Sequence, residues 1–355
     1  MLWLLQAHSL ASQLSSCRSH LFSVITANLF TTAMRATQTD GSEQEISLNR
    51  TRAVKHASQG EVDVEGRWSV YGQVFRAMHG RSASSLRRTG QLWKVSFTGE
   101  EGRDAGGPYR ESWTLMSQEM MSPCLPLLKP SPNGKFGTGF NRDAFVLNPD
   151  ATSADQIQMF EFLGKLMGVA ARSGLFLDIT LAPIVWKLLT EEDLELADYE
   201  GIDVIGASLI AKLRAGEDSP EMFQVLYEDI SFEVSSLSGE RTVELHPGGA
   251  GHQLTWETRE RYCEELERFR LREMATVAAA VRRGLCTQIP LMALKLMRWD
   301  ELERRVCGNP VVDLDLLQTA SEYEGYSSSD PVVKWFWEIM TEFTLEQRKV
   351  GWLQF

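Results

Sequence analysis

The sequence predicts an α+β fold that is mostly helical and carries a few short β-hairpins. Apolar residues recur every three or four positions through most of the 355 residues, a spacing that places them on one face of a helix. Alternating apolar and polar residues, which are typical of half-buried strands, appear only in short runs. A second pattern begins after Cys307-Gly308-Asn309-Pro310, because a glycine followed shortly by a proline ends a helix. We therefore expect a larger helical part followed by a smaller one.

The composition is that of a globular protein with a sizeable core. Hydrophobic residues make up 43% of the chain and charged residues 24%, as in ordinary soluble domains. The formal net charge of −12 disfavours nucleic acid as a partner, since nucleic acid selects a basic surface. Polar residues interrupt the apolar patches of residues 1–34, which therefore fit neither a signal peptide nor a membrane span. We expect no membrane contact.

Five cysteines are spread over the chain without any Cys-x-x-Cys pair. An odd number with wide spacings indicates neither a disulfide framework nor a zinc site. Free thiols are typical of a reducing compartment, so we expect a cytoplasmic or nuclear protein. We also expect no metal and no cofactor. The cysteines are Cys17, Cys124, Cys263, Cys286 and Cys307.

The N-terminal part of the chain changes from polar to structured. Residues 35–65 are polar and read as a linker or disordered segment, so we assign residues 1–66 to a partly disordered N-terminal extension. Order is expected to begin near Trp68 with a helix. Alternation over 91–97 predicts a strand, and the amphipathic stretch 109–120 predicts another helix.

The stretch 155–172 predicts a largely buried helix, because its apolar residues recur every three or four positions. Polar residues just before it offer N-cap candidates, and Gly174 is a natural C-cap. Gly164 and Gly168 lie four residues apart. Their helix face therefore allows another backbone to come close.

The next part predicts short helices, a hairpin and a long helix. Residues 179–214 read as short helices, and the strand-like runs 230–234 and 241–245 predict a hairpin around Ser238-Gly239. Residues 256–281 predict one long amphipathic helix with a charged outer face.

The C-terminal stretch combines several unusual pieces. An acidic-aliphatic helix at 300–306 precedes the break, and a tyrosine-rich turn at 323–326 leads into an aromatic helix around 335–337. Apolar residues at helical spacing continue to the end at Phe355 and need a partner to cover them. We therefore expect the chain to stop inside a domain.

The order of these blocks resembles the HECT ubiquitin-ligase domain. The block at 93–111, which resembles the opening of that domain, is most similar to that of the large HERC-type members. The resemblance covers about residues 70–355 and rests on several pieces in one order. The matching pieces are 93–95, 104–111, 162–168, 174–178, 254–262, 301–303, Gly308, Asp313-Leu314, 323–326, Phe336-Trp337 and Leu353-Gln354-Phe355.

This resemblance implies a HECT N-lobe at 67–308 and the truncated start of an α/β C-lobe at 309–355, with Gly308 as the hinge. HECT ligases are ubiquitin-protein transferases: a C-lobe cysteine accepts ubiquitin as a thioester from a conjugating enzyme and passes it to a substrate lysine. A thiol suits this relay because thiolate is a strong nucleophile. We expect the chain to end before that cysteine, so we assign no catalytic residue. Whether this fragment is itself an enzyme stays open.

The resemblance also implies a conjugating-enzyme-binding subdomain at about 202–262. By position it assigns a binding role to Leu209, Leu213 and Tyr262, and we add Met222 and Phe223 to this set. The alternative is that these five residues are ordinary core. The implied partners are a ubiquitin-conjugating enzyme and, in the full-length protein, ubiquitin and protein substrates. A non-catalytic module that binds conjugating enzymes is the alternative function, and a helical scaffold without a link to ubiquitin is a third.

His246 and His252 flank the glycine-rich run 248–251 in the same region. Two histidines without further ligands are too few for a metal site, and the run lacks the Lys-Ser/Thr of a phosphate loop. We expect this run to be a turn.

Overall fold

The computed structural model describes residues 13–14, 17–40, 43–88, 90–100, 106–216, 219–309 and 314–343. The chain divides into two compact units, Met1–Val306 and Cys307–Phe355, and each is described by itself. Residues 104–105, 310–313 and 350–355, which belong to patterns discussed above, lie outside the described residues.

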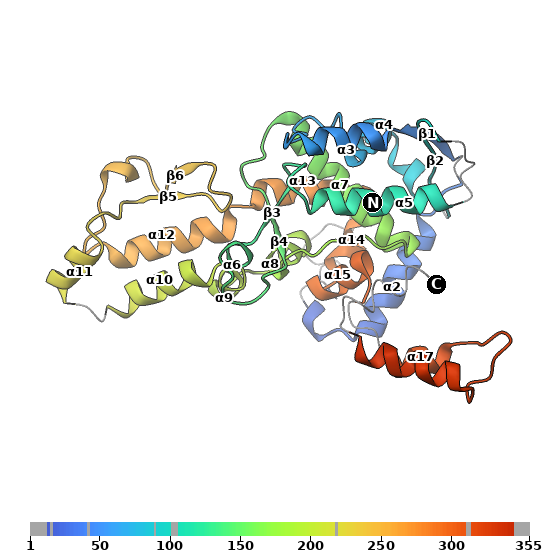
Figure 1. The fold of residues 1–355 in the computed structure, drawn as a ribbon. Coiled ribbons are helices and arrows are strands. Elements are labelled where there is room, and N and C mark those ends of the chain that lie inside the picture. Colours follow the sequence, from blue (N-terminus) through green and yellow to red (C-terminus); the bar gives the residue numbers. More distant parts are fainter. Residues whose placement is uncertain are drawn as a thin grey trace. The chain divides into compact units, whose positions relative to one another are not determined.

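The first unit is mostly helical, and its described residues form three two-stranded sheets (Figure 1). β1 and β2 pair in parallel, whereas β3 with β4 and β5 with β6 pair antiparallel. No helix in the described part of the chain is long and apolar enough to cross a membrane. The elements up to residue 190 are η2 (Arg18–His20), α2 (Ser23–Ala36), β1 (Gln44–Leu48), α3 (Arg50–Ser58), α4 (Val70–Met78), η3 (Ala83–Leu86), β2 (Trp93–Phe97), α5 (Gly107–Met120), β3 (Leu128–Pro130), α6 (Pro132–Phe136), β4 (Phe145–Leu147), α7 (Ala154–Ser173) and α8 (Pro183–Thr190). Those that follow are α9 (Leu196–Glu200), α10 (Val204–Ala215), α11 (Pro220–Leu226), β5 (Glu233–Ser235), β6 (Thr242–Glu244), η4 (Gly249–Gly251), α12 (Arg259–Arg272), α13 (Ala275–Gln288), α14 (Leu291–Lys295) and α15 (Trp299–Cys307).

The packing of α7 against α13 forms the centre of this unit. A Cβ on Gly164 would lie 1.8 Å from the carbonyl oxygen of Val281, and a Cβ on Gly284 would lie 1.7 Å from that of Glu161. No side chain fits such a space, so the two backbones touch. The close approach expected from the glycine spacing is confirmed.

The ends of α7 follow the sequence signals. The Ser153 hydroxyl accepts a hydrogen bond from the backbone N–H of Gln156, whose side chain accepts one from the N–H of Ser153. This reciprocal pair is a capping box, which satisfies two N–H groups that a helix start leaves without partners. At the other end Gly174 adopts φ 71°, a conformation that favours glycine.

The prediction of a single long helix at 256–281 is wrong. The structure has two helices there, α12 and α13, which meet at Glu273 and Met274. The buried Glu273 carboxylate accepts hydrogen bonds from the Leu237 N–H at 2.7 Å and from the Arg270 guanidinium at 2.8 Å. The apolar stripe continues across the break, so periodicity alone could not show it.

The polar segment 35–65 is not a linker in the structure. β1 pairs with β2, and its alternate residues Ile46 and Leu48 are buried. The helix α3 follows and buries Ala53 and His56. Each element buries few side chains, which is why its composition is that of a linker.

The helix α2 also packs onto the first unit. Its buried residues Thr26, Phe30 and Met34 lie four residues apart, as one face of a helix requires. The Arg172 guanidinium of α7 donates hydrogen bonds to the carbonyl oxygens of Met34 at 3.1 Å and Gln288 at 2.8 Å. One side chain thus holds the ends of α2, α7 and α13 together.

Two carboxylates from other parts of the chain lie at the N-terminus of α4. Asp63 accepts hydrogen bonds from backbone N–H groups just before this helix. Glu119 of α5 accepts from the N–H groups of Val70 at 2.8 Å and Tyr71 at 2.7 Å. Burial raises the pKa of Glu119 to about 7, while those two hydrogen bonds act in the opposite direction and the charge of Asp63 adds to the rise.

The second unit contains α16 (Leu314–Ala320) and α17 (Pro331–Glu342) among its described residues. The Trp337 indole N–H donates to the Tyr323 hydroxyl at 2.8 Å. This contact joins the expected tyrosine-rich turn to the expected aromatic helix. A small core consists of Val333, Trp337 and Met340, against which Leu314, Leu317, Tyr323 and Phe343 pack.

We expect Gly164→Ala to lower the free energy of unfolding by about 3 kcal/mol or more, because the added methyl group overlaps the backbone of α13. Helix propensity alone would favour alanine by up to about 1 kcal/mol, so the loss is steric. Denaturant unfolding followed by circular dichroism measures the effect. Gly80→Ala is the matched control, since no atom lies within 4 Å of a Cβ there. Wild-type stability of Gly164→Ala would refute the contact.

The pKa of Glu119 makes stability depend on pH. Its carboxyl has a pKa of about 7 in the folded chain against an ordinary value of 4.5. The folded chain therefore binds this proton more tightly, so the stabilisation is fully present below pH 4.5 and is lost as the pH rises through 7. Relative to Glu119→Gln, the wild type should lose up to about 3 kcal/mol across this window. Urea unfolding at a series of pH values tests this, and a stability difference that does not change with pH would contradict it.

Candidate partner-binding surface

The helices α10, α11 and α12 and the β5–β6 hairpin lie together at one end of the first unit (Figure 1). We call this part the 204–272 segment. Within it α10 packs along α12, and α9 contacts both helices. The side chains of Asp203 and Ser219 cap α10 and α11 by accepting hydrogen bonds from Gly206 and Met222. The predicted short helices and the predicted hairpin are confirmed in this region.

Three of the five residues assigned to partner binding lie in the interior of this segment. Leu213, Phe223 and Tyr262 are 1%, 2% and 3% exposed. The Tyr262 ring meets the Phe232 ring edge-on with centroids 5.2 Å apart, and the Phe223 ring meets the Trp256 ring in the same way at 5.5 Å. These side chains hold α11, the hairpin and α12 together. Leu209 is partly buried on α10.

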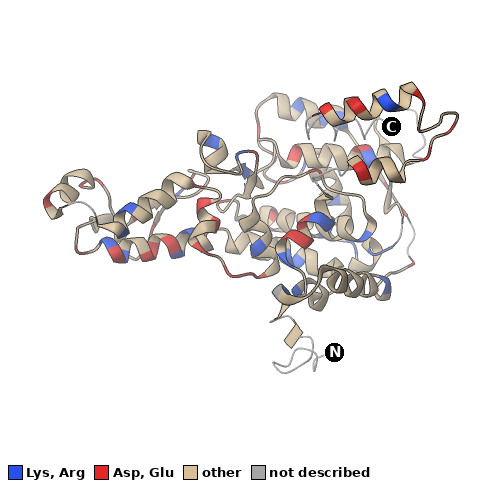
Figure 2. Cartoon of the chain, turned by 90° about the horizontal axis from the view of Figure 1, so that it is seen from below, with Lys and Arg blue, Asp and Glu red and all other residues tan. Residues whose placement is uncertain are grey.

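The outer face of α11 is apolar and exposed. Met222, Val225 and Leu226 are 54%, 69% and 56% exposed. Glu221 is the one charged residue within α11, so this face carries little charge (Figure 2). The buried Phe223 anchors the helix from its inner side. The result is a small apolar surface on a fixed support, which we call the α11 face.

Only Met222 of the α11 face was assigned from the sequence. Met222, Val225 and Leu226 follow one another at helical spacing, so the sequence alone could have placed them on one face of a helix. Spacing does not tell, however, which side of a short helix is covered. The structure supplies this information through the burial of Phe223.

The two histidines of the glycine-rich turn join a polar and aromatic cluster. His246 Nδ1 lies 2.6 Å from a Glu265 carboxylate oxygen, and His246 Nε2 lies 3.2 Å from His252 Nδ1. The His252 ring stacks on Phe232 with centroids 4.5 Å apart. The residues that the structure describes include no group of three or more His, Cys, Asp or Glu arranged to hold a metal ion. The cluster packs the hairpin against α12.

Three thiols lie in surroundings that disfavour a thiolate. Burial raises the pKa of Cys124 and of Cys263 to about 11, and it raises that of Cys286 as well. A reactive cysteine has the opposite shift, because the thiolate is the nucleophile. Cys263 is completely buried and belongs to the core.

Gly308 directly follows α15 and has φ 83°. This left-handed conformation ends a helix and changes the direction of the chain. A role of Gly308 as a hinge stays a prediction.

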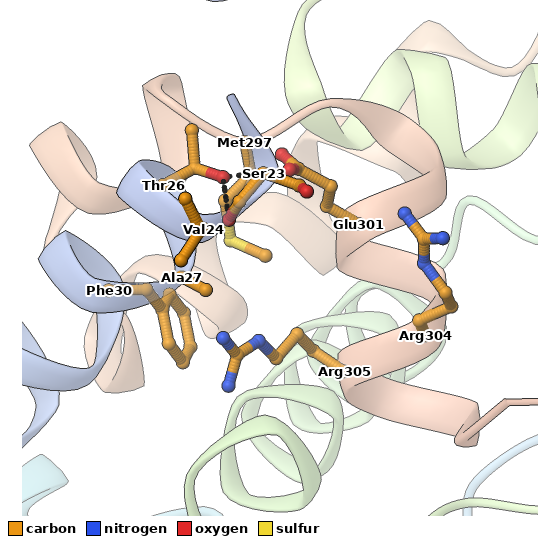
Figure 3. Close-up of a pocket in the computed structure, with 9 residues that line it drawn as sticks. All are labelled: Ser23, Val24, Thr26, Ala27, Phe30, Met297, Glu301, Arg304 and Arg305. Atoms are coloured by element: carbon orange, nitrogen blue, oxygen red, sulfur yellow. Dashed lines mark hydrogen bonds between the residues drawn. The ribbon is translucent and has the colours of Figure 1, made fainter. Parts of the chain in front are cut away.

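A pocket of about 380 Å³ lies between α2 and α15 (Figure 3). The Thr26 hydroxyl donates to the Glu301 carboxylate at 2.7 Å, and the Arg305 guanidinium lies over the Phe30 ring at 4.7 Å from its centroid. These contacts join α2 to α15. The lining contains neither a cysteine nor a histidine and so offers no nucleophile for a thioester. It consists of Ser23, Val24, Thr26, Ala27, Phe30, Met297, Glu301, Arg304 and Arg305.

The described structure is a mostly helical α+β domain, as the sequence predicted. Comparison with known families defines it further: residues 114–355 match the model of the HECT-domain (ubiquitin-transferase) family. This chain belongs to that family.

Three relatives show the range of the similarity. The E3 ubiquitin-protein ligase HERC2 of Mus musculus is 34% identical over 306 residues, which cover 86% of this chain and 6% of that protein. The probable E3 ubiquitin-protein ligase HECTD4 of Homo sapiens is 29% identical over 276 residues, 72% of this chain and 7% of that protein. The E3 ubiquitin-protein ligase RSP5 of Chaetomium thermophilum is 25% identical over 303 residues, 84% of this chain and 35% of that protein. The chain thus spans a small part of the length of these relatives.

We expect Tyr262→Ala to destabilise the 204–272 segment by about 3–5 kcal/mol, because it removes a buried ring from the contact with Phe232. Tyr262→Phe keeps the ring and is the matched control. Hydrogen exchange of α11 and α12 should accelerate in the alanine variant and stay near the wild-type rate in the phenylalanine variant. Unchanged exchange in Tyr262→Ala would show that the ring is not part of this core.

Proposed function

We propose that this chain forms the part of a HECT-type ubiquitin-protein ligase that recruits a ubiquitin-conjugating enzyme. The N-lobe is assigned to 67–308 and the start of the C-lobe to 309–355, with docking through the 204–272 segment. The enzyme relay would pass ubiquitin through a cysteine thioester to a lysine of a protein substrate. The cytoplasm or nucleus, where this relay operates, is the proposed location.

The α11 face is the observation that carries this proposal. Apolar side chains that stay more than half exposed on a well-anchored helix are favourable contact points for another protein. The patch is small, as in weak or transient complexes, which bury less surface than permanent ones. A conjugating enzyme has to be released after each transfer, and a small apolar contact permits this.

The five residues that the sequence assigned to partner binding divide into an exposed group and a buried group. Met222 contributes directly to the proposed docking surface, and Leu209 lies partly exposed on the neighbouring helix. Leu213, Phe223 and Tyr262 would act from the interior by keeping α11 in place. Val225 and Leu226 are new members of the surface.

The test is the double substitution Met222→Ser with Leu226→Ser, titrated against a panel of ubiquitin-conjugating enzymes. We expect binding to weaken about tenfold or more, which corresponds to about 1.4 kcal/mol. Both side chains already face solvent, so the thermal unfolding midpoint should stay close to that of the wild type. Biolayer interferometry gives the affinities.

Val54→Ser is the matched control, because Val54 is 68% exposed on α3, outside the 204–272 segment. It should bind as the wild type does. A folded double variant with unchanged affinity would remove the α11 face from the site. A wild-type chain that binds no conjugating enzyme would overturn the proposed function.

A further inference from the structure

The Asp150 carboxylate lies at a junction between the hairpin and the rest of the first unit. Asp150 follows β4 and precedes α7, far in sequence from β5 and β6. It accepts hydrogen bonds from the hydroxyls of Ser236, at 2.5 Å, and Ser238. The Arg241 guanidinium donates to its other oxygen at 2.8 Å. All three donors belong to the turn that joins β5 to β6.

Hydrogen bonds of the Asp150 backbone and of the neighbouring Asn148 fix the position of this carboxylate. The Asn148 side chain accepts from the Asp150 N–H at 3.1 Å and donates to the Pro126 carbonyl oxygen at 2.9 Å. The backbone N–H of Asn148 donates to the Leu127 carbonyl oxygen at 2.9 Å. The Asp150 side chain itself is 7% exposed. A nearly buried charge with three donors is strongly held, because each of these hydrogen bonds is charge-assisted.

The chain passes into and out of the 204–272 segment at two neighbouring points. It passes in beside Tyr199 and Asp203, where the Tyr199 hydroxyl donates to the Asp203 carboxylate at 2.7 Å. It passes out at Glu273, which pairs with Arg270. The two points lie next to each other, because α9, which carries Tyr199, contacts α12, which carries Arg270. The charge of Arg270 accordingly interacts with Tyr199 and Asp203 as well as with Glu273.

The hairpin turn lies beside the second of these points, because the Leu237 N–H donates to the Glu273 carboxylate at 2.7 Å. Asp150 ties the same turn to the stretch between β4 and α7, to which neither passage point belongs. A second ion pair, Lys129 with Glu240 at 2.8 Å, links the turn to β3. These side-chain contacts oppose tilting of the segment about the two points where the chain passes.

We propose that Asp150 is a positioning residue that fixes the orientation of the 204–272 segment, and with it the α11 face, relative to the rest of the first unit. This inference rests on the proposed function in one respect: a fixed orientation would present a docked conjugating enzyme in one direction. The contact itself is independent of any partner. Loss of Asp150 therefore alters the orientation of the segment and leaves the α11 face intact.

The test compares Asp150→Ala with wild type by electron–electron distance measurement between spin labels carried on non-canonical amino acids at Gln158 and Gln224. Both positions are exposed, on α7 and α11 respectively. The wild type should give one narrow distance distribution, and Asp150→Ala a distribution at least twice as broad. Asp150→Asn keeps an acceptor for the hydroxyls without the charge, so it should give a width between the two. Hydrogen exchange at the Leu237 N–H should rise tenfold or more in Asp150→Ala.

Asp143→Ala is the control, since Asp143 is exposed in the loop before β4. It should leave both measurements unchanged. Affinity for a conjugating enzyme should stay within twofold of wild type in Asp150→Ala, because the α11 face is untouched. A folded Asp150→Ala with the wild-type distance distribution would overturn the positioning role. Failure of the wild type to bind any conjugating enzyme would overturn the proposed function alone, since the distance measurement needs no partner.

Discussion

The backbone contact between α7 and α13 is the constraint on which the first unit depends. Gly164 and Gly284 each face a carbonyl oxygen of the other helix, at distances that exclude any side chain. Close packing of two helix backbones maximises dispersion contacts and leaves little room for adjustment. The position of α13 is thereby determined by α7. The other elements have to arrange themselves around this pair.

The position of α13 in turn determines the point at which the 204–272 segment ends. The chain leaves that segment at Glu273 and continues directly into α13. Glu273 and Arg270 are largely buried, and their charges are paired with each other. A buried ion pair of this kind contributes specific geometry more reliably than it contributes stability. The break in the expected long helix is therefore the place where the 204–272 segment joins α13.

Local sequence signals predicted the elements whose ends and buried positions are encoded within the element itself. The helix α7 has apolar periodicity, a capping box and a C-cap glycine, and all three agree. The hairpin was predicted from two strand-like runs around Ser238-Gly239. The break at Glu273 could not be predicted in this way, because it depends on the Leu237 N–H of a distant turn. The strand β1 was missed because its burial depends on pairing with β2, which lies more than forty residues further on.

The candidate site shows the same limit. Apolar residues such as Met222 and Tyr262 could be recognised as special, but a sequence does not distinguish an anchor from a contact surface. The structure makes this distinction, since Tyr262 is buried and Met222 is exposed. The role of Asp150 could not be inferred from its neighbours in sequence, because its three donors lie more than eighty residues away.

In the second unit, the helix α17 carries both buried and exposed apolar side chains. One face of α17 packs into a small core through Val333, Trp337 and Met340. The residues between them, Trp335 and Ile339, are 60% and 50% exposed. A helix that is apolar on both sides is stable in water only when a second layer covers it, or when it associates with another surface. The α11 face differs from this, because it is short, flanked by polar residues and mounted on one buried ring. The two helices thus expose apolar side chains in different settings, α17 beside a buried apolar core and α11 on one side of a short helix.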